Sequence, residues 1–345
     1  MLPLLGTAAA RPADAVRPAG NRLYGAAVRA DRLGEDPALQ AALIADCGWI
    51  TPEIDFKWNA LEYRRDGWWF ERADALVGFA RANGQLLRGH TLMWDQSTPD
   101  WAKADLAERR DWALVERWFG QALGRYASDA CEWDVVNEPI DTEQGDGDLR
   151  RTCFQRAFGK GYVARALHLA HDLAPDLRLM VNEYGLDYAN PVERDRRKAL
   201  VKLVEQLLAR GVPLHGVGVQ AHLDLAKGPL DAAEITRMLR VFSDMGLSVT
   251  ITELDVREAD RALPIGARDA AVADEVRRYL DIVLAEPVVR GVVSWGLSDR
   301  DSWLQDDIGA RSPLALNRGL PRDAAFRRKP AYWTLRDALE NSRIA

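Results

Sequence analysis

Two glutamates stand where apolar, β-branched runs of the sequence give way to polar residues. Glu138 lies in the segment 133–139 (WDVVNEP), and Glu253 lies in the segment 250–255 (TITELD). Hydrolysis of a glycosidic bond needs one protonated carboxyl to protonate the leaving oxygen, and one ionised carboxylate to attack or to activate water. The alternative is that each glutamate only caps a helix or pairs with an arginine. Two such glutamates together favour catalysis on a sugar chain.

Indole and imidazole side chains follow other runs of the same kind. A sugar ring presents an apolar face and a rim of hydroxyls, so stacking indoles and a few fixed polar groups suit a neutral carbohydrate. The chain contains 12 tryptophans, which points the same way, although a place in the core is the alternative for any one of them. The residues with this placement are His90, Trp94, Gln220, His222, Trp295 and Trp303.

Patterns that could bind a metal are weaker. His168 and His171 are three apart in a helical stretch, but no third ligand accompanies them. The segment 144–148 (QGDGD) matches only part of a calcium-binding loop. We therefore expect neither a metal ion nor an organic cofactor. The three cysteines, Cys47, Cys131 and Cys153, contain no CxxC pair, and three thiols can form at most one disulfide.

Eight short runs of apolar or β-branched residues alternate with longer stretches of helical periodicity. This order predicts parallel strands joined by crossover helices, and eight units predict an α/β fold, a single-domain, eight-stranded parallel (β/α)8 TIM barrel. An open doubly wound sheet is the alternative, but it would bring a glycine-rich phosphate turn after the first strand, and the segment 24–27 (YGAA) is not one. The expected strands are Leu23–Val28, Gly48–Thr51, Leu86–Thr91, Glu132–Asn137, Arg178–Asn182, Gly216–Ala221, Ser248–Thr252 and Gly291–Trp295.

A TIM barrel carries its catalytic groups at the carboxyl ends of its strands. The two glutamates and the aromatic residues stand at such ends, so they are expected to converge on one mouth. The clearest helix follows Asn190, which caps it, with Pro191 at the first position and Gly211 at the end. Further helices are expected at about 71–82, 111–127, 154–173, 231–245 and 267–285.

Composition limits the partners of this chain. Of its 345 residues, 48% are hydrophobic and 28% are charged, and the formal net charge is −6. The acidic residues are dispersed and no basic surface is available for phosphates, so we expect no nucleic-acid partner. No run reaches the roughly 18 consecutive apolar residues that a membrane span requires, so we expect no membrane partner either.

The N-terminal 20 residues differ from the rest of the chain. Residues 1–10 are uncharged and end in three alanines, as the end of an export signal does, but a basic n-region is missing. A tail without a role is the alternative. We expect residues 1–20 to be a tail or the remnant of an export signal, residues 21–345 to form the catalytic barrel, and the protein to be a secreted or periplasmic monomer.

Six motifs in order resemble glycoside hydrolase family 10, the endo-1,4-β-xylanases. The resemblance spans residues 22–340 and includes 329–333 (KPAYW) at the start of the last helix. It implies endo-acting, retaining cleavage of the β-1,4-xylosidic bonds of xylan and xylo-oligosaccharides by double displacement. The motifs are 52–58 (PEIDFKW), 88–94 (RGHTLMW), 133–138 (WDVVNE), 217–223 (VGVQAHL), 251–255 (ITELD) and 294–304 (SWGLSDRDSWL).

The resemblance also implies residue roles. Glu138 is the implied acid/base and Glu253 the implied nucleophile. Asn137 is implied to bond the 2-hydroxyl of the substrate, and His222 to support the nucleophile. The residues implied to bind substrate are Glu53, Lys57, His90, Trp94, Tyr184, Gln220, Asp255, Trp295 and Trp303.

The chain departs from the family pattern at a few positions near these motifs. Ile54 stands where Asn is usual, 95–97 (DQS) replaces a segment that usually begins with His, Pro139 follows the implied acid/base, and Glu183 stands where Asp is frequent. The departures leave the catalytic pair intact and concern the sugar-binding subsites, those on the glycone side above all. Two alternatives remain: a related β-1,4-glycanase that acts on cellulose or mixed-linkage glucan, and a non-catalytic barrel that binds xylan.

Overall fold

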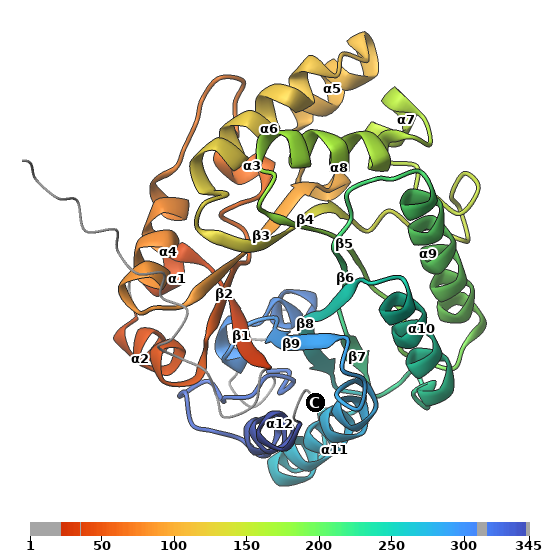
Figure 1. Ribbon diagram of the computed structural model, residues 1–345. Coiled ribbons are helices and arrows are strands. Elements are labelled where there is room, and N and C mark those ends of the chain that lie inside the picture. The colour runs from red at the N-terminus through yellow and green to blue at the C-terminus, as the bar shows by residue number, and fades with distance from the viewer. Residues whose placement is uncertain (1–21, 35, 309–315, 343–345) are drawn as a thin grey trace, which may run out of the picture.

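The predicted strands form a closed parallel barrel in the computed structural model, which describes residues 22–34, 36–308 and 316–342. Each strand pairs in parallel with its neighbours, and the pairings of β1 with β9 and of β6 with β8 close the ring (Figure 1). The predicted eight-stranded TIM barrel is confirmed. The strands are β1 (Leu23–Val28), β2 (Trp49–Pro52), β3 (Leu86–Met93), β4 (Ala130–Asn137), β5 (Arg178–Glu183), β6 (Gly216–Val219), β8 (Ser248–Arg257) and β9 (Val289–Ser294).

A ring of helices surrounds the barrel, one after each strand (Figure 1). These are α2 (Pro37–Asp46), α4 (Glu71–Ala82), α6 (Ala113–Tyr126), α8 (Tyr162–Leu173), α9 (Pro191–Ala209), α10 (Ala232–Asp244), α11 (Ile265–Val283) and α12 (Pro330–Asn341). Further short helices lie in the connections that follow the strands. They are α1 (Ala30–Leu33), α3 (Trp58–Leu61), α5 (Asp100–Arg109), α7 (Cys153–Phe158), η1 (Asp95–Ser97), η2 (Asp299–Asp301) and η3 (Trp303–Ile308).

Two of the expected helices show where local signals are sufficient and where they are not. The helix after Asn190 is confirmed as α9, because the Asn190 side chain accepts the N–H of Glu193 at 2.9 Å and Pro191 takes the first position. The prediction of one continuous helix over 154–173 is wrong. The chain breaks at Gly159, whose φ of 73° only glycine adopts readily, and α7 and α8 are separate helices.

The sixth strand is shorter than predicted. It ends at Val219, and Ala221 takes a φ of 60° in the left-handed region. The chain then resumes as β7 (His222–Asp224), which pairs with the far end of β8, with His222 opposite Asp255. The predicted strand 216–221 is therefore interrupted, and the interruption sets His222 beside the carboxylates of β8.

Many of the tryptophans are buried. Six of the 12 are buried, and one of these, Trp295, lies at the candidate site described below. In the core, Trp58 stacks on Trp118 with ring centroids 5.2 Å apart. Trp133 lies against Phe56 at 5.2 Å. The high tryptophan count is thus largely explained by packing between the barrel and its helices, and only some of the indoles are available to a ligand.

A buried charge network fills part of the barrel interior below the mouth. The guanidinium of Arg88 bonds both carboxylate oxygens of Asp134 and, at 2.8 Å, Oε1 of Glu132. Asp134 also bonds Nδ1 of His90 at 2.8 Å. Burial raises the pKa of Asp134, but the charge of Arg88 and the bond to His90 outweigh this and hold it below its ordinary value. His90 is thereby anchored from beneath.

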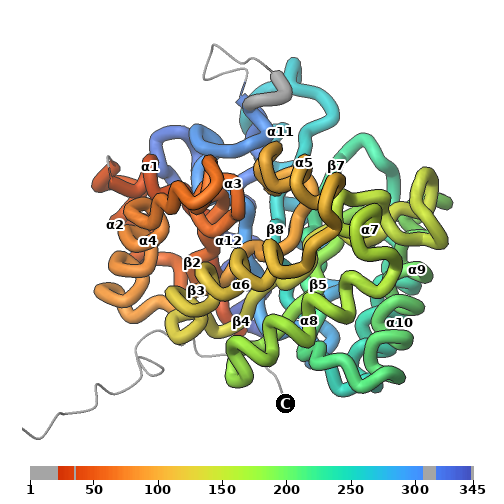
Figure 2. Tube along the Cα trace, turned by 90° about the horizontal axis from the view of Figure 1, so that it is seen from above, coloured from red at the N-terminus to blue at the C-terminus, as the bar shows by residue number. Residues whose placement is uncertain are grey.

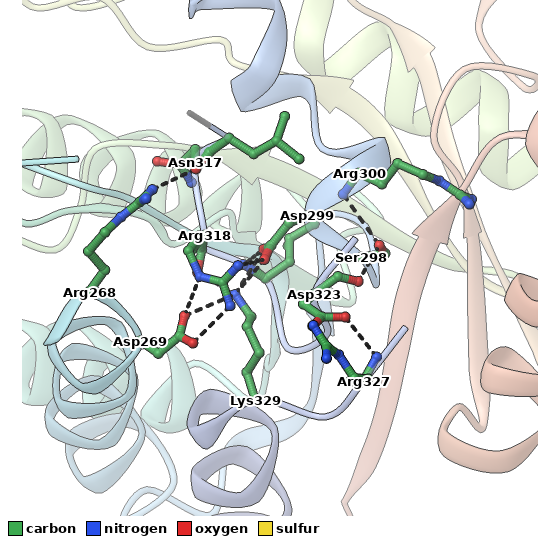
Figure 3. A network of polar contacts seen from close by, with 12 residues as sticks. Arg268, Asp269, Ser298, Asp299, Arg300, Asn317, Arg318, Asp323, Arg327 and Lys329 are labelled. Carbon is green, nitrogen blue, oxygen red and sulfur yellow. Dashed lines mark hydrogen bonds and ion pairs between the residues drawn. The ribbon is translucent and has the colours of Figure 1, made fainter. Parts of the chain in front are cut away.

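A second polar network fastens the chain after β9 (Figure 3). The Lys329 ammonium bonds Asp299 at 2.8 Å, and Arg318 bonds Asp269 of α11 at 2.7 Å. Asp299 also accepts the N–H of Leu320 at 3.1 Å. The network connects η2, the segment 317–329 and the starts of α11 and α12, so it holds the stretch that leads to Trp303.

Four further sequence expectations concern the N-terminal tail, the cysteines, membrane spans and metal ligands. The expected tail or export-signal remnant lies outside the described residues. All three cysteines are free, so no disulfide forms among them. Among the residues that the structure describes, none of the helices combines the length and apolar character needed to cross a bilayer. In the same ranges, no cluster of three or more His, Cys, Asp or Glu side chains is placed to hold a metal ion.

Two glycines test how tightly the barrel is packed. A Cβ on Gly89 of β3 would lie 1.9 Å from Trp133 Cδ2, whereas a Cβ on Gly120, inside α6, meets nothing within 4 Å. We expect Gly89→Ala to lower the free energy of unfolding by about 1–3 kcal/mol or more, and Gly120→Ala to raise it by about 0.5–1 kcal/mol. Chemical denaturation of the two variants measures both. Equal effects would contradict this account of the packing.

Candidate active site

Glu138 is held in place through its backbone. It follows β4 directly and has a φ of 55°, which is costly for a residue with a side chain. Its N–H donates to the Asn182 carbonyl at 2.8 Å, and its own carbonyl accepts Nε of Arg150 at 2.9 Å. Arg150 also donates to the Ile140 carbonyl and to the Tyr184 hydroxyl, each at 3.0 Å. These bonds over-determine the turn that aims the Glu138 carboxyl.

Glu183, one of the departures from the family pattern, supports the same turn. Its buried carboxyl group accepts the N–H of Ile140 at 2.8 Å and that of Tyr184 at 3.0 Å. Burial and the charge of Glu138 raise the pKa of Glu183 to about 8, while Arg196 opposes the shift. The longer side chain therefore acts as a backbone anchor beside the Glu138 carboxyl.

Glu253 is held through its carboxylate. Oε1 accepts a hydrogen bond from Nδ2 of Asn182 at 2.7 Å, and Oε2 lies 3.2 Å from Nε2 of His222. The other ring nitrogen of His222 lies 2.8 Å from Oδ1 of Asp255. The result is a line of alternating charge from Glu253 through His222 to Asp255.

This line keeps Glu253 ionised. Burial raises the pKa of Glu253, but the bond to His222 and the charges of His90, His222 and Lys57 outweigh it, so the pKa lies below its ordinary value. Burial lowers the pKa of His222, but the charge of Asp255 and the bonds to both carboxylates raise it to about 10. At neutral pH the ring is therefore a cation between two anions.

Three amides connect the two glutamates. Asn182 donates to Glu253 and also, at 2.8 Å, to Oδ1 of Asn137. Asn137 Nδ2 lies 3.3 Å from Glu138 Oε1, and Gln220 Nε2 lies 3.3 Å from the same oxygen. A continuous chain of hydrogen bonds thus joins the carboxyls of Glu138 and Glu253.

Asn182 was not among the sequence-predicted site residues. Its position could have been noticed, because it lies one residue before the end of β5, directly opposite Asn137 at the end of β4. Thr252 donates to its amide oxygen at 2.7 Å, and a Cβ on Gly218 would lie 2.1 Å from that oxygen. Only glycine at position 218 leaves room for this amide.

Aromatic rings surround one side of the carboxylates. The Lys57 ammonium lies 4.5 Å from the Trp94 ring centroid and 5.7 Å from that of Trp295. The His90 ring is 5.2 Å from Trp295. Trp303 donates from Nε1 to Asp255 at 2.6 Å and lies 5.1 Å from the His222 ring. The indoles are therefore fixed by charged groups as well as by packing.

Glu53 and Lys57, at the edge of this group, each affect the pKa of the other. Burial raises the pKa of Glu53 to about 7, while the charges of Lys57 and Arg29 oppose the shift. Burial lowers the pKa of Lys57, opposed by the charges of Glu253, Glu53 and Glu138. The charges of both glutamates that the family resemblance implies in catalysis therefore act on Lys57.

The structure brings most of the sequence-predicted site residues together. Glu138, Asn137, Gln220, Glu253, His222, Asp255 and Trp303 are joined by the contacts above, and Glu53, Lys57, His90, Trp94 and Trp295 form the aromatic and charged side of the same group. Tyr184 joins through Arg150, which the sequence reasoning did not single out. Roles in catalysis and binding remain predictions for all of these residues.

Two other departures have different local settings. The Asp95 carboxylate accepts the N–H of Cys153 at 2.5 Å, so it caps the start of α7. Ile54 is half-buried, between Glu53 and the buried Asp55 in the turn after β2, and it is absent from the barrel's hydrophobic core. The departure at Asp95 is therefore explained by a structural contact. The departure at Ile54 is not explained by packing in the hydrophobic core.

Comparison with known proteins gives a consistent result. Residues 13–338 match the model of glycosyl hydrolase family 10. An endo-1,4-beta-xylanase 1 from Humicola insolens is 31% identical over 327 residues, covering 93% of this chain and 72% of that protein. An endo-1,4-beta-xylanase from Agaricus bisporus is 31% identical over 318 residues, covering 91% and 90%.

Solved structures resemble the barrel over nearly its whole length. Native xylanase 10B from Thermotoga maritima is 26% identical with a TM-score of 0.80, covering 93% of this chain and 95% of that one. Xylanase 10B from Thermotoga petrophila RKU-1, solved in complex with xylobiose, is 25% identical with a TM-score of 0.81, covering 93% and 94%.

The charge line through His222 can be tested without any substrate. We expect the imidazole of His222 to stay protonated until the pH approaches about 10, because its folded pKa is raised. Asp255→Asn should lower that pKa, because it removes the negative charge that contributes most to raising it. The Asn side-chain oxygen can still accept the hydrogen bond from Trp303 Nε1. The measurement is a pH titration of imidazole 15N chemical shifts.

His215 provides the internal control for this titration. Burial and the charge of Arg178 lower its pKa below the ordinary value, so it should be neutral at pH 7 in both proteins. A His222 that titrates near pH 6.5 in the wild-type protein would contradict the charge line.

Proposed function

The chain belongs to glycosyl hydrolase family 10 and is an endo-1,4-β-xylanase, and we propose that it cleaves xylan with retention of configuration by double displacement. In this proposal Glu253 is the nucleophile and Glu138 is the acid/base. One observation carries the assignment: Glu253 is buried yet held ionised, and a chain of amides links it to Glu138.

The first step forms a covalent sugar–enzyme ester. The ionised Glu253 attacks the anomeric carbon, the bond to the leaving oxygen breaks, and Glu138 gives its proton to that oxygen. Asn182 and His222 hold the two oxygens of Glu253, so the attacking carboxylate is oriented before substrate arrives.

The second step returns the enzyme to its starting state. Glu138, now ionised, takes a proton from water, and the water oxygen attacks the anomeric carbon and displaces Glu253. Two inversions give a product with the original β configuration. Asn137, which contacts both Asn182 and Glu138, is the proposed partner of the substrate 2-hydroxyl.

Substrate is proposed to lie along the aromatic side of the site. Trp295 and Trp303 offer indole surface near His222, while Lys57 and His90 supply donors beside Trp94. Stacking surface with a few fixed polar groups suits a neutral xylose chain.

The catalytic pair is tested by removing each carboxyl. We expect Glu253→Ala and Glu138→Ala each to reduce hydrolysis of β-1,4-xylan by at least about 10³-fold, with azide restoring turnover in one or both. For the wild-type enzyme, 1H NMR should show the β-anomer as the first product. Wild-type-like activity in either variant, or an α-anomer first, would refute the assignment.

A comparison of polymers separates the alternatives. Cellulose and mixed-linkage glucan carry a hydroxymethyl group that xylan lacks, and we expect xylan to be the preferred substrate. Binding of xylan without release of reducing sugar by the wild-type protein would instead indicate a non-catalytic barrel.

Ile54 gives a test of the glycone side. An isoleucine offers no donor or acceptor to a sugar hydroxyl, whereas an asparagine amide offers both. We expect Ile54→Asn to raise kcat/KM on short xylo-oligosaccharides by a few-fold to about tenfold, because one recovered hydrogen bond contributes about 0.5–1.5 kcal/mol.

The control for this variant is its stability. If Ile54→Asn leaves the kinetics on short substrates unchanged and lowers the melting temperature, Ile54 serves only packing and the subsite argument fails. Ile54→Val, which adds no polar group, should leave kcat/KM on the same substrates near the wild-type value.

A further inference from the structure

A groove with a volume of about 470 Å³ lies between α3 and α5. Its walls come from residues 59–65, just after Lys57, and from residues 96–103, just after Trp94. Figure 2 shows α3 and α5 at the end of the barrel where β7 lies. This surface, called the α3–α5 groove below, therefore adjoins the Lys57 and Trp94 end of the candidate active site.

One wall of the groove is a preformed turn built on the buried Glu62. The Glu62 carboxylate accepts Nε1 of Trp58 at 2.9 Å, the N–H of Asp66 at 2.8 Å and the guanidinium of Arg117 at 2.7 Å. Its carbonyl accepts Nε1 of Trp101 at 3.3 Å. These four contacts fix the turn from inside, so the backbone of the outward-facing residues 63–65 is held in place.

The groove is cationic on a chain whose formal net charge is −6. Arg64, Arg65 and Lys103 line it, and Asp100 is the single carboxylate among its lining residues in the described structure. Arg65 is paired with Asp105 at 2.7 Å. No ion pair engages Arg64 or Lys103 within the described ranges, so two positive charges are available to a ligand.

Aromatic and amide groups accompany these cations. The Tyr63 side chain is 73% exposed, and Trp101 is half-buried beneath Arg65, whose Cζ lies 4.8 Å from the ring centroid. The amides of Asn59 and Gln96 complete the lining. Ring surface, amides and uncommitted cations together suit a sugar that carries a carboxylate, since each part of such a ligand has a partner.

We propose that the α3–α5 groove binds a hexuronic acid substituent carried by the xylan chain, and so directs the enzyme toward acidic xylan. The proposal rests on the proposed function, because the substituent reaches the groove only when its backbone occupies the adjoining site. Arg64 and Lys103 bind the carboxylate, and Tyr63 contacts the sugar ring.

The test compares a uronic-acid-substituted xylan with the same polymer after reduction of its carboxyl groups to hydroxymethyl groups. For the wild-type enzyme we expect kcat/KM at low ionic strength to be about three- to tenfold higher on the acidic polymer, and the ratio to fall toward one in 1 M NaCl. In Arg64→Gln/Lys103→Gln the ratio should approach one while kcat/KM on the reduced polymer stays unchanged. Asp100→Asn should raise the ratio.

A matched control removes the same charge elsewhere. Lys198→Gln/Arg237→Gln changes exposed cations on α9 and α10 and should keep the wild-type ratio. A wild-type ratio of one, or an unchanged ratio in Arg64→Gln/Lys103→Gln, would overturn the groove proposal. If the wild-type protein cleaves neither polymer, the proposed function fails, and the relative affinity for the two polymers in gel electrophoresis still decides the groove.

Discussion

The arrangement of polar side chains at the mouth of this barrel depends on keeping the buried carboxylate of Glu253 ionised. A carboxylate removed from water is unstable unless donors and cations replace the lost solvent. Asn182 and His222 supply the donors, and Lys57 adds charge. His222 in turn requires Asp255, so one buried anion accounts for polar residues on several strands.

The two glutamates are constrained in opposite ways. Both carboxylate oxygens of Glu253 are hydrogen-bonded, whereas Glu138 is held through its backbone N–H and carbonyl. In the described part of the chain, the Glu138 carboxyl accepts hydrogen bonds from two side-chain amides, each at 3.3 Å. A nucleophile benefits from a fixed carboxylate, but an acid/base must exchange a proton at each step. Arg150 and Glu183 support the backbone here, so the Glu138 carboxyl is left free for the proton exchange that the proposed mechanism assigns to it.

The sequence predicts the barrel well because each of its units carries a local signal. The strand at 23–28 and the helix after Asn190 follow from apolar patterning and a cap. The break at Ala221 does not, since a non-glycine residue with positive φ is imposed by the surrounding contacts. The glutamate positions were evident because they end apolar runs. Asn182 was missed because its role lies in contacts between strands far apart in the sequence.

The buried contacts of Asp134 limit how the sequence can have changed during evolution. Its carboxylate serves Arg88 on one side and His90 on the other, with no exposure to solvent. Replacing Arg88 or Asp134 alone breaks this buried ion pair and leaves a charge without that partner, which is far more costly than exchanging both together. These positions should therefore change in concert among related sequences, and a lineage that altered one of them alone would have passed through an unstable ancestor.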